Sequence, residues 1–385
     1  MRIPAIAAGL VLTIGLLSAP AHLQQIQKGG EDETGPYDVV AKWPQPWAKQ
    51  GYIWGSQPGV FAETPDRIFL AVRGELKLPE KLGRGYNGIW GSLGERATVP
   101  TAEMRNCLLV VDRNGKVVEA WTQWDKLFEG SGGPHKVKIS PFDPDRHVWV
   151  VNDSMHQIYK FTNDGKQLVM TLGERGVQGE DDTHFGTPQD IAFLPDGSLV
   201  IADGLRNSRV VKLDRNGRFI KAWGTQGDGP GQFRGLHGIE ATKSGRIYVA
   251  DRGNRRIQVF DGEGNLLRVM TIDVPYDPDA QPAIGGKPDV QKLIKSGAVL
   301  TQTPGAPWAL CITPPPNQVL YVSDSYPGRI YKLTLDGKVQ GWLGGSGKVL
   351  KKFGWIHEIA CPSENELYVA ELLNWRTQKL VLHPR

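Results

Sequence analysis

The sequence predicts an all-β fold, a six-bladed β-propeller whose ring is closed by an N-terminal strand. First, a unit of roughly 40 residues recurs along the chain with the same order of apolar strands and polar turns, as in repeat architectures. Second, the 385 residues include 47 glycines and 27 prolines, which suits a chain with many tight turns. Repeats of four short antiparallel strands are typical of propeller blades, which close on themselves into a ring.

The N-terminal residues 1–21 have the pattern of an export signal. A basic start at Arg2 is followed by an apolar run over residues 3–17 and by small residues up to Ala21. This order is typical of a cleaved signal peptide, and the run is too short to cross a bilayer. We therefore expect cleavage after Ala21, no stable membrane insertion and a secreted or periplasmic protein. Residues 22–36 are expected to form a flexible segment ahead of a propeller over 37–385.

Composition and charge are those of an ordinary globular protein. Hydrophobic residues make up 40% of the chain, and the formal net charge is +4. A charge this close to balance implies no polyanionic partner. We expect a monomer that does not bind nucleic acid.

The clearest copy of the repeat is HGIEATKSGRIYVADRGNRRIQVFDGEGNLLRVM, which starts at His237. It contains an apolar strand, a Gly turn, a strand ending in Val-Ala-Asp, a polar turn, a third strand, an Asp-x-x-Gly turn and a fourth strand. The preceding copy, from Pro188, has the same order, with Asp-Gly at 196–197 and Asn-Gly at 216–217. Such dipeptides favour the positive φ angles of tight hairpins, so each copy predicts four antiparallel strands.

Six copies of this unit account for the chain after the N-terminal segment. The predicted blades cover approximately residues 55–121, 133–173, 185–224, 235–271, 307–343 and 355–383. The last copy ends after its third strand, and the segment YDVVAKW at 37–43 is free to supply the missing outer strand. Closure of this kind leaves no open sheet edge.

Two insertions interrupt the repeats, at about 75–105 and at 273–305. Both are rich in glycine, proline and charge, and long loops within a compact domain are usually functional or disordered. We expect them to cover one face of the ring.

The three cysteines, Cys107, Cys311 and Cys361, lie far apart and form no CxxC pair, which excludes a thiolate zinc site of the usual spacing. All three lie in or beside apolar runs, so their burial tendency favours free buried thiols. A Cys311–Cys361 disulfide is the alternative.

Aligning the first strands of the copies places five residues at one equivalent position. They are His135, Gln189, His237, Trp308 and His357. The histidines fall in copies two, four and six, and alternate blades of a six-bladed ring are about a third of a turn apart. Three imidazoles at one depth would converge on the axis as a His₃ site for a divalent metal ion, for which zinc is expected. The other five histidines are interpreted as ordinary surface or core residues.

Other charged residues lie next to this position. Glu358 is interpreted as a ligand of a second metal ion or an orienting partner, with a solvated loop carboxylate as the alternative. Arg73 and Arg252 follow second strands at the channel and could clamp a substrate carboxylate, although either could form a surface ion pair.

Aspartates end the second strands of four copies, at Asp153, Asp203, Asp251 and Asp324. Repetition in several blades predicts a structural, turn-capping role. The chain has no Gly-rich phosphate loop, GxSxG elbow or HExxH motif, which argues against the enzyme classes that use them.

The repeat resembles the NHL repeat. The segments PHKVKI, GLHGIEA and WIHEIA in copies two, four and six resemble those of the peptidyl-α-hydroxyglycine α-amidating lyase family and its bacterial relatives. Further matches between about 121 and 271 are WTQWDKLF, HFGTPQDIAFLPDG and VADRGNRRIQVF. The likeness covers nearly the whole mature chain. It implies a zinc-dependent lyase that cleaves a carbinolamide N–C bond to release an amide and glyoxylate.

The resemblance also implies residue roles. It assigns zinc binding to His135, His237 and His357, and substrate binding or polarisation to Arg73 and Arg252.

By the same resemblance, Glu358 takes the place of a calcium-binding aspartate, and backbone carbonyls near Val60 and Val137 would complete a structural calcium site. Leu205 stands where the family has a catalytic tyrosine. Tyr326, in the corresponding position of copy five, is expected to face the same channel and is the candidate substitute.

Two alternatives to a lyase remain: a non-catalytic propeller that binds a partner, and a hydrolase of lactones or similar esters. A binding surface has no need of convergent histidines, and such hydrolases typically use carboxylates and asparagine on calcium. We expect a lyase-like enzyme whose substrate is a small molecule or peptide with a carboxylate.

Overall fold

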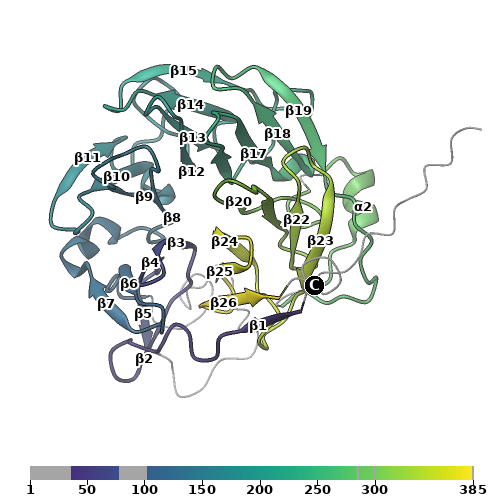
Figure 1. The fold of residues 1–385 in the computed structure, drawn as a ribbon. Helices are drawn as coiled ribbons and strands as arrows, with labels where there is room; N and C mark the ends of the chain where they lie inside the picture. Colours follow the sequence, from purple (N-terminus) through teal and green to yellow (C-terminus); the bar gives the residue numbers. More distant parts are fainter. Residues whose placement is uncertain (1–35, 78–101, 284–285, 299, 384–385) are drawn as a thin grey trace, which may run out of the picture.

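The computed structural model describes residues 36–77, 102–283, 286–298 and 300–383. Six four-stranded antiparallel sheets surround a central axis, each with its first strand innermost (Figure 1). The predicted six-bladed β-propeller is confirmed. The expected signal peptide, most of the segment 22–36 and residues 78–101 of the first insertion lie outside the described residues.

The first three blades follow one another along the chain. Blade 1 contains β3 (Gly59–Thr64), β4 (Arg67–Ala71), β6 (Leu108–Val111) and β7 (Val117–Ala120). Blade 2 contains β8 (Lys136–Ile139), β9 (Val148–Asn152), β10 (Gln157–Phe161) and β11 (Leu168–Leu172). Blade 3 contains β12 (Pro188–Phe193), β13 (Leu199–Asp203), β14 (Arg209–Leu213) and β15 (Phe219–Trp223).

The last three blades repeat this order. Blade 4 contains β16 (Ile239–Ala241), β17 (Ile247–Asp251), β18 (Arg256–Phe260) and β19 (Leu266–Thr271). Blade 5 contains β20 (Leu310–Ile312), β21 (Leu320–Ser323), β22 (Arg329–Leu333) and β23 (Val339–Gly344). Blade 6 contains β24 (Ile356–Ser363), β25 (Glu366–Glu371) and β26 (Arg376–Leu382).

The N-terminal strand β1 (Tyr37–Val39) completes blade 6 and closes the ring, as predicted. Tyr37 lies opposite Leu382 in the antiparallel pair of β1 with β26. The strand is shorter than the expected 37–43, because Lys42 adopts a positive φ of 57° and the chain turns to bury Trp43. Closure pairs the exposed edge of β26.

The apolar core is divided into six clusters, one between each pair of neighbouring blades. The second strands β9, β13 and β17 are buried at every position. Both faces of such a strand pack against other blades, which explains why these strands are continuous apolar runs in the sequence.

Cys311 in β20 and Cys361 in β24 form a disulfide that joins the first strands of blades 5 and 6. The favoured interpretation of these two residues as free thiols is wrong, because their separation of 50 residues brings them to facing positions in neighbouring blades. Cys107 is a buried free thiol, as expected.

The two insertions differ in what the structure describes. In the first, β5 (Glu75–Lys77) pairs with β2 (Tyr52–Trp54). The second contains helix α2 (Val290–Lys295) and lies against turns of blades 4 and 5, where Leu300 N–H donates to the Gly253 carbonyl.

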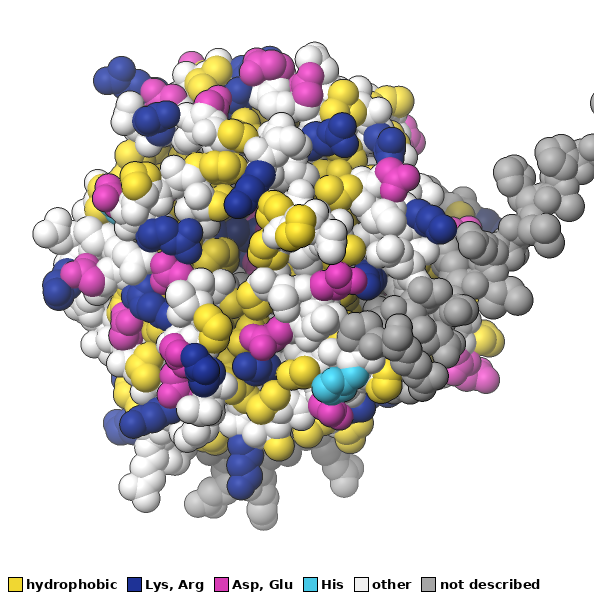
Figure 2. Space-filling model, in the orientation of Figure 1, with side chains coloured by type: hydrophobic (Ala, Val, Ile, Leu, Met, Phe, Trp, Pro, Cys, Tyr) yellow, Lys and Arg dark blue, Asp and Glu magenta, His cyan; other side chains and the backbone are white. Residues whose placement is uncertain are grey.

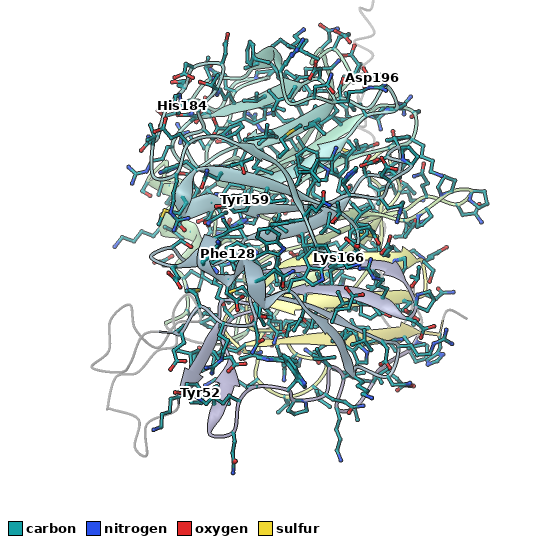
Figure 3. All side chains as sticks on the ribbon, turned by 90° about the vertical axis from the view of Figure 1, so that its left-hand side faces the viewer. Tyr52, Phe128, Tyr159, Lys166, His184 and Asp196 are labelled. Carbon is teal, nitrogen blue, oxygen red and sulfur yellow. A yellow bond between two sulfur atoms is a disulfide. The ribbon has the colours of Figure 1, made fainter. Side chains whose placement is uncertain are left out.

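Figure 3 shows the ring from its edge, and it distinguishes the two mouths of the channel. Lys166 and Asp196, in hairpins between strands, lie on one face, whereas Tyr52 and His184 lie toward the other. Because His184 is in the loop that leads into β12, the second face is where first strands begin. We call the opening on that face the entrance mouth and the opposite opening the far mouth.

The far-mouth face carries lysine and arginine mixed with acidic and hydrophobic side chains (Figure 2), in keeping with the small net charge. A cavity of about 320 Å³ opens on the channel here, lined by the first strands of all six blades. Among the described residues, no helix has the length and apolar character needed to span a bilayer.

Candidate metal centre

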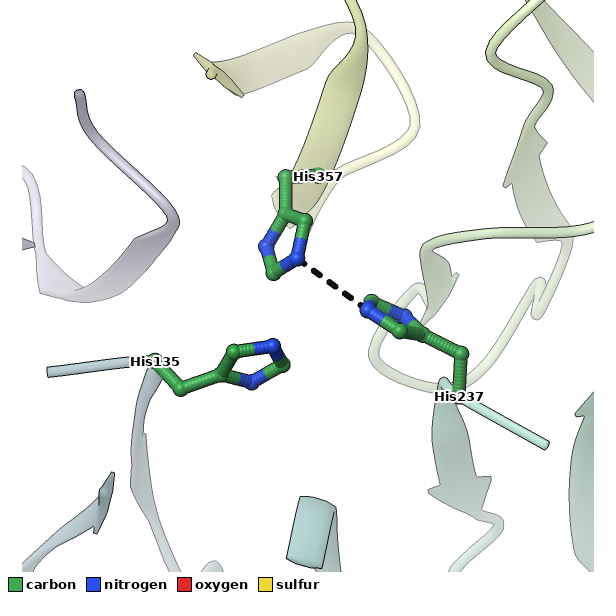
Figure 4. A group of neighbouring side chains, drawn as sticks. All are labelled: His135, His237 and His357. Carbon is green, nitrogen blue, oxygen red and sulfur yellow. Dashed lines mark hydrogen bonds between the residues drawn. The ribbon is translucent and has the colours of Figure 1, made fainter. Parts of the chain in front are cut away.

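Three histidines from alternate blades meet at the axis of the channel, near the entrance mouth. His135 precedes β8, His237 precedes β16, and His357 is the second residue of β24. Their ring centroids are 4.6 to 5.3 Å apart (Figure 4), and each residue is at most 2% exposed. One ligand nitrogen from each lies within 4.8 Å of the other two. The structure thus brings together the three residues that the repeat alignment placed at one depth.

One ring nitrogen of each histidine is fixed by a backbone carbonyl of the next blade. The three Nδ1-to-oxygen contacts are His135 to Gln189 at 2.7 Å, His237 to Trp308 at 3.0 Å and His357 to Pro58 at 2.8 Å. A carbonyl only accepts, so each Nδ1 carries the proton and each Nε2 keeps its lone pair. This arrangement is the one that metal-binding histidines use to fix their tautomer and orientation.

The Nε2 atoms are better placed to bind a cation than to hydrogen-bond with one another. Nε2 of His237 lies 3.1 Å from Nε2 of His357 (Figure 4). With both Nδ1 atoms protonated, this contact brings two lone pairs face to face. A divalent metal ion that prefers nitrogen ligands, such as zinc, would satisfy both and the third imidazole.

Burial keeps the three imidazoles neutral. It lowers the pKa of His135 to about 4, and the charges of Lys136 and Arg73 add to this effect. Burial likewise lowers the pKa values of His237 and His357 well below the usual 6.5. Since only neutral imidazole binds metal, the ligand set is ready for metal at neutral pH.

Two buried arginines, Arg73 and Arg252, lie beside the histidines. Arg252 has its Cζ 3.8 Å from the ring centroid of Trp308, and its Nε donates to the Gly235 carbonyl at 3.0 Å. Burial lowers the pKa of Arg252 to about 9, and its charge lowers the pKa of His237.

Arg73 approaches from blade 1 and is 9% exposed. Its side chain lies so close to Gly133, whose φ is 89°, that a Cβ there would stand 2.9 Å from the arginine Cγ. Its Nε has no hydrogen-bond partner among the residues that the structure describes. Within the described part of the chain, neither Arg73 nor Arg252 forms an ion pair with a carboxylate.

Asp153 is a site residue that the sequence interpretation missed. The repeat alignment groups it with the turn-capping aspartates, but the strand register does not. Asn152 lies opposite Gln157 in blade 2, and Asp251 lies opposite Arg256 in blade 4, so Asn152 is the residue equivalent to Asp251. Asp153 therefore corresponds to Arg252, and each begins a 3₁₀ turn. Its Oδ2 lies 3.7 Å from Nε2 of His135. Blade 2 has Val-Val-Asn-Asp where blade 4 has Val-Ala-Asp, and this extra residue is the sequence signal that Asp153 lies one position beyond the turn-capping aspartates.

The remaining aspartates of the repeat are structural, as predicted. Asp203 accepts hydrogen bonds from Gly186 N–H and Thr187 N–H, and it pairs with Arg209. Asp251 accepts a hydrogen bond from Arg234 N–H. Asp324 accepts hydrogen bonds from Gly305 N–H and Gly328 N–H. In blade 6 this position is Glu371, which accepts from Gly354 N–H and pairs with Arg376.

Five charged side chains close the channel beneath the histidines. Lys136 Nζ lies 2.8 Å from Glu358 Oε2, and Lys138 Nζ lies 2.5 Å from Glu240 and 3.3 Å from Asp190. Burial raises the pKa of Glu358, and the two lysines oppose that shift. These pairs separate the histidines from the far-mouth cavity.

This arrangement does not fit the expected calcium site at Glu358, Val60 and Val137. The ammonium of Lys136 takes the Glu358 carboxylate, and a second cation beside it would meet strong repulsion at such low exposure. The expectation overlooked Lys136, because its carboxylate partner is on another blade.

The structure does not bring Tyr326 to the histidines. Its hydroxyl donates to the Ala280 carbonyl at 3.0 Å, and its ring packs against Tyr276 of the second insertion. The expectation that it could replace a catalytic tyrosine is wrong for this reason. Leu205 is 47% exposed and carries no group that transfers a proton.

Comparison with known proteins gives matches in sequence and in fold. The NHL repeat family matches residues 233–260, which lie in blade 4. The chain is 35% identical over 282 residues to peptidyl-glycine alpha-amidating monooxygenase A of Xenopus laevis, covering 69% of this chain and 29% of that protein. It is 28% identical to peptidyl-alpha-hydroxyglycine alpha-amidating lyase 1 of Drosophila melanogaster, covering 64% and 44%. The chain thus spans less than half the length of these relatives.

Solved structures show the fold at low sequence identity. A streptogramin B lyase structure aligns with a TM-score of 0.51 and 12% identity, covering 90% of this chain and 98% of that one. An auxiliary nutrient binding protein from Bacteroides thetaiotaomicron aligns with a TM-score of 0.53 and 14% identity, covering 93% and 75%. The structural matches show the propeller fold, and the sequence matches show one NHL repeat in blade 4 and similarity to peptidyl-α-hydroxyglycine α-amidating lyases.

Proposed function

We propose that this chain is a zinc-dependent lyase that cleaves a peptidyl-α-hydroxyglycine-type carbinolamide into an amide and glyoxylate. The observation that carries the proposal is that two buried arginines, Arg73 and Arg252, have no carboxylate partner among the described residues and lie beside three histidines with a metal-ligand arrangement. A buried unpaired charge is costly, and an anionic substrate would offset that cost. The likeness to amidating lyases supplies the reaction class.

The arrangement of side chains suits this reaction. Zinc held by the three Nε2 atoms would supply a Lewis acid for the substrate hydroxyl oxygen. Arg252 and Arg73 would bind the substrate carboxylate through paired N–H groups. In the reaction the hydroxyl loses its proton and becomes the carbonyl of glyoxylate, the C–N bond breaks, and the amide nitrogen gains a proton. No water is consumed.

Asp153 supplies a proton acceptor that Leu205 lacks. Its carboxylate is in the blade adjacent to that of Leu205, and it lies beside Nε2 of His135. We assign it to accept the hydrogen of the substrate hydroxyl, so that in this chain the acceptor comes from blade 2.

We also propose that the protein functions outside the cytoplasm as a monomer. The disulfide between Cys311 and Cys361 suits an oxidising compartment, and the N-terminal pattern suits export. Sequencing the N-terminus of the mature protein should give a start at His22. A mature protein that still begins at Met1 would contradict export by cleavage.

The direct test is glyoxylate release from an α-hydroxyglycyl peptide by the purified protein, with bound metal measured on the same sample. We expect about one zinc per chain and turnover. A triple variant with His135, His237 and His357 changed to alanine should lose both. His383→Ala, which removes an exposed histidine paired with Asp38 and outside both possible metal-binding groups, is the matched control and should keep both.

The outcomes separate the parts of the proposal. Metal without glyoxylate release would reject this reaction and keep the site. Zinc retained by the triple variant would reject the site itself.

A further inference from the structure

A buried ion pair connects the residues that directly follow two of the three histidines. Lys136 follows His135 at the start of β8, and Glu358 follows His357 in β24. Lys136 Nζ lies 2.8 Å from Glu358 Oε2 and also donates to the His357 carbonyl at 2.5 Å. Both side chains are at most 1% exposed. A single ammonium therefore bridges blades 2 and 6 one residue below the metal ligands.

The partners of this ammonium are those that a hard divalent cation would take. Ca²⁺ in proteins is bound by carboxylate and backbone carbonyl oxygens. Here Lys136 donates to the His357 carbonyl and forms an ion pair with the Glu358 carboxylate, whose Oε2 has no hydrogen-bond partner among the described residues. The positive charge that a divalent ion could provide at this depth is thus supplied by the ammonium group of Lys136.

We infer that Lys136 is a built-in structural cation, which positions His135 and His357 for metal binding and makes a second, divalent ion in the channel unnecessary. The positioning role of Lys136 rests on the proposed function, because it requires a metal ion at the histidines. The replacement of a divalent ion by Lys136 does not depend on that metal.

Lys136 binds the backbone of a ligand residue itself, whereas Lys138 contacts the Ile239 carbonyl and Glu240, two and three residues beyond His237. The two contacts of Lys136 fix the strand of one ligand against the backbone of another ligand. Small displacements of ligand atoms weaken metal binding, because the ligands must be held within a fraction of an ångström of their positions. Loss of the ammonium should therefore weaken the histidine site without removing any ligand.

Lys138 provides a matched control. It is two residues further along β8, it is 7% exposed, and it also pairs with buried carboxylates. Its partners, Glu240 and Asp190, are in blades 4 and 3 and do not adjoin His357. Replacing Lys138 removes a comparable ion pair, between β8 and β16, but leaves the direct contact of Lys136 with the backbone of the ligand residue His357.

The first test compares metal affinity in two lysine variants, Lys136→Met and Lys138→Met, which keep most of the aliphatic side chain. Zinc and cobalt(II) dissociation constants are measured by competition with a chelator, and folding is checked by circular dichroism. We expect at least a tenfold weaker affinity for Lys136→Met and less than a threefold change for Lys138→Met. Equal affinities in both variants would overturn the positioning role.

The second test asks whether Ca²⁺ can replace the ammonium. The unfolding temperature is measured with and without millimolar Ca²⁺ for the native sequence, for Lys136→Ala and for Lys136→Ala combined with Glu358→Gln. We expect no shift for the native sequence, a Ca²⁺-dependent rise of several degrees for Lys136→Ala, and loss of that rise in the double variant. Stoichiometric calcium in the native protein, or no calcium response in folded Lys136→Ala, would overturn the inference.

Repeating the calcium test in the variant that lacks all three histidines separates this inference from the proposed function. The calcium response of Lys136→Ala should persist there, whether or not the histidines bind zinc. If Lys136→Ala does not fold, Lys136→Ser with the same measurement takes its place.

Discussion

The turn after the second strand places one side chain beside the metal ligands in blades 1, 2 and 4. These side chains are Arg73, Asp153 and Arg252, and each affects the pKa of a channel histidine. Two positive charges and one negative charge therefore surround three neutral imidazoles. Such a site favours an anionic substrate that also carries a hydrogen-bond donor.

Changing Arg252 to Met should weaken binding of the carboxylate substrate. Removal of charge-assisted hydrogen bonds costs about 1.5–3 kcal/mol, so kcat/KM should fall roughly 10- to 100-fold. Zinc content should stay at the native level, since the residue is not a ligand. Arg255→Met, outside the channel, is the control for loss of an arginine. Unchanged kinetics for Arg252→Met would remove this residue from the site.

Changing Asp153 to Asn should lower kcat about 100-fold with little effect on KM, because a proton acceptor acts mainly on the chemical step. Steady-state kinetics of Asp153→Asn and of Asp143→Asn, a carboxylate that pairs with His147 away from the channel, make the comparison. A kcat for Asp153→Asn as high as that of the Asp143 control would show that Asp153 takes no part.

Residue positions could be predicted where the repeat determines them. The three histidines were found because a repeat assigns each first strand the same depth in the ring. Asp153 was misassigned because blade 2 has Asn152 at the structural position, which shifts the alignment by one residue. Lys136 was not recognised because its partner, Glu358, is 222 positions further along the chain and becomes a neighbour only when the ring closes.

At the scale of strands, adjacent blades are held by apolar packing and by one covalent bond between β20 and β24. The disulfide spans 50 residues of sequence. Closing a loop of that length lowers the entropy of the unfolded chain and should stabilise the fold by about 4 kcal/mol.

The double variant Cys311→Ala/Cys361→Ala should therefore unfold at lower urea concentration than the native protein. Reduction of the native protein should lower its stability by a similar amount. Cys107 is a free thiol, so reduction does not change it. Equilibrium urea unfolding measures the difference. Equal midpoints for the oxidised native protein and the double variant would show that the bond adds no stability.

The strands themselves were predictable to a large extent, because turn dipeptides and buried apolar runs mark their ends. The disulfide was harder to predict, because the sequence does not show which first-strand positions of neighbouring blades face each other. The role of Tyr326 could not be predicted either. Its hydroxyl is bound by the second insertion, and the sequence gives no indication of that contact.

For the whole molecule, ring closure is what creates the site. Blade 6 is completed by β1 from the N-terminal end, and its innermost strand, β24, carries His357 to the axis beside His135 and His237. Symmetry of six blades lets three alternate side chains converge, while the carbonyls of the intervening blades orient their rings. Ion pairs lie between the histidines and the far-mouth cavity.

X-ray absorption at the zinc edge of the purified protein tests the central claim most directly, that the three channel histidines hold a metal ion through Nε2. We predict three imidazole nitrogens at about 2.0–2.1 Å, with the remaining coordination from oxygen. Changing His357 to alanine should remove one imidazole from the spectrum or abolish zinc binding. A first shell containing sulfur, or a native spectrum that His357→Ala leaves unchanged, would contradict the account.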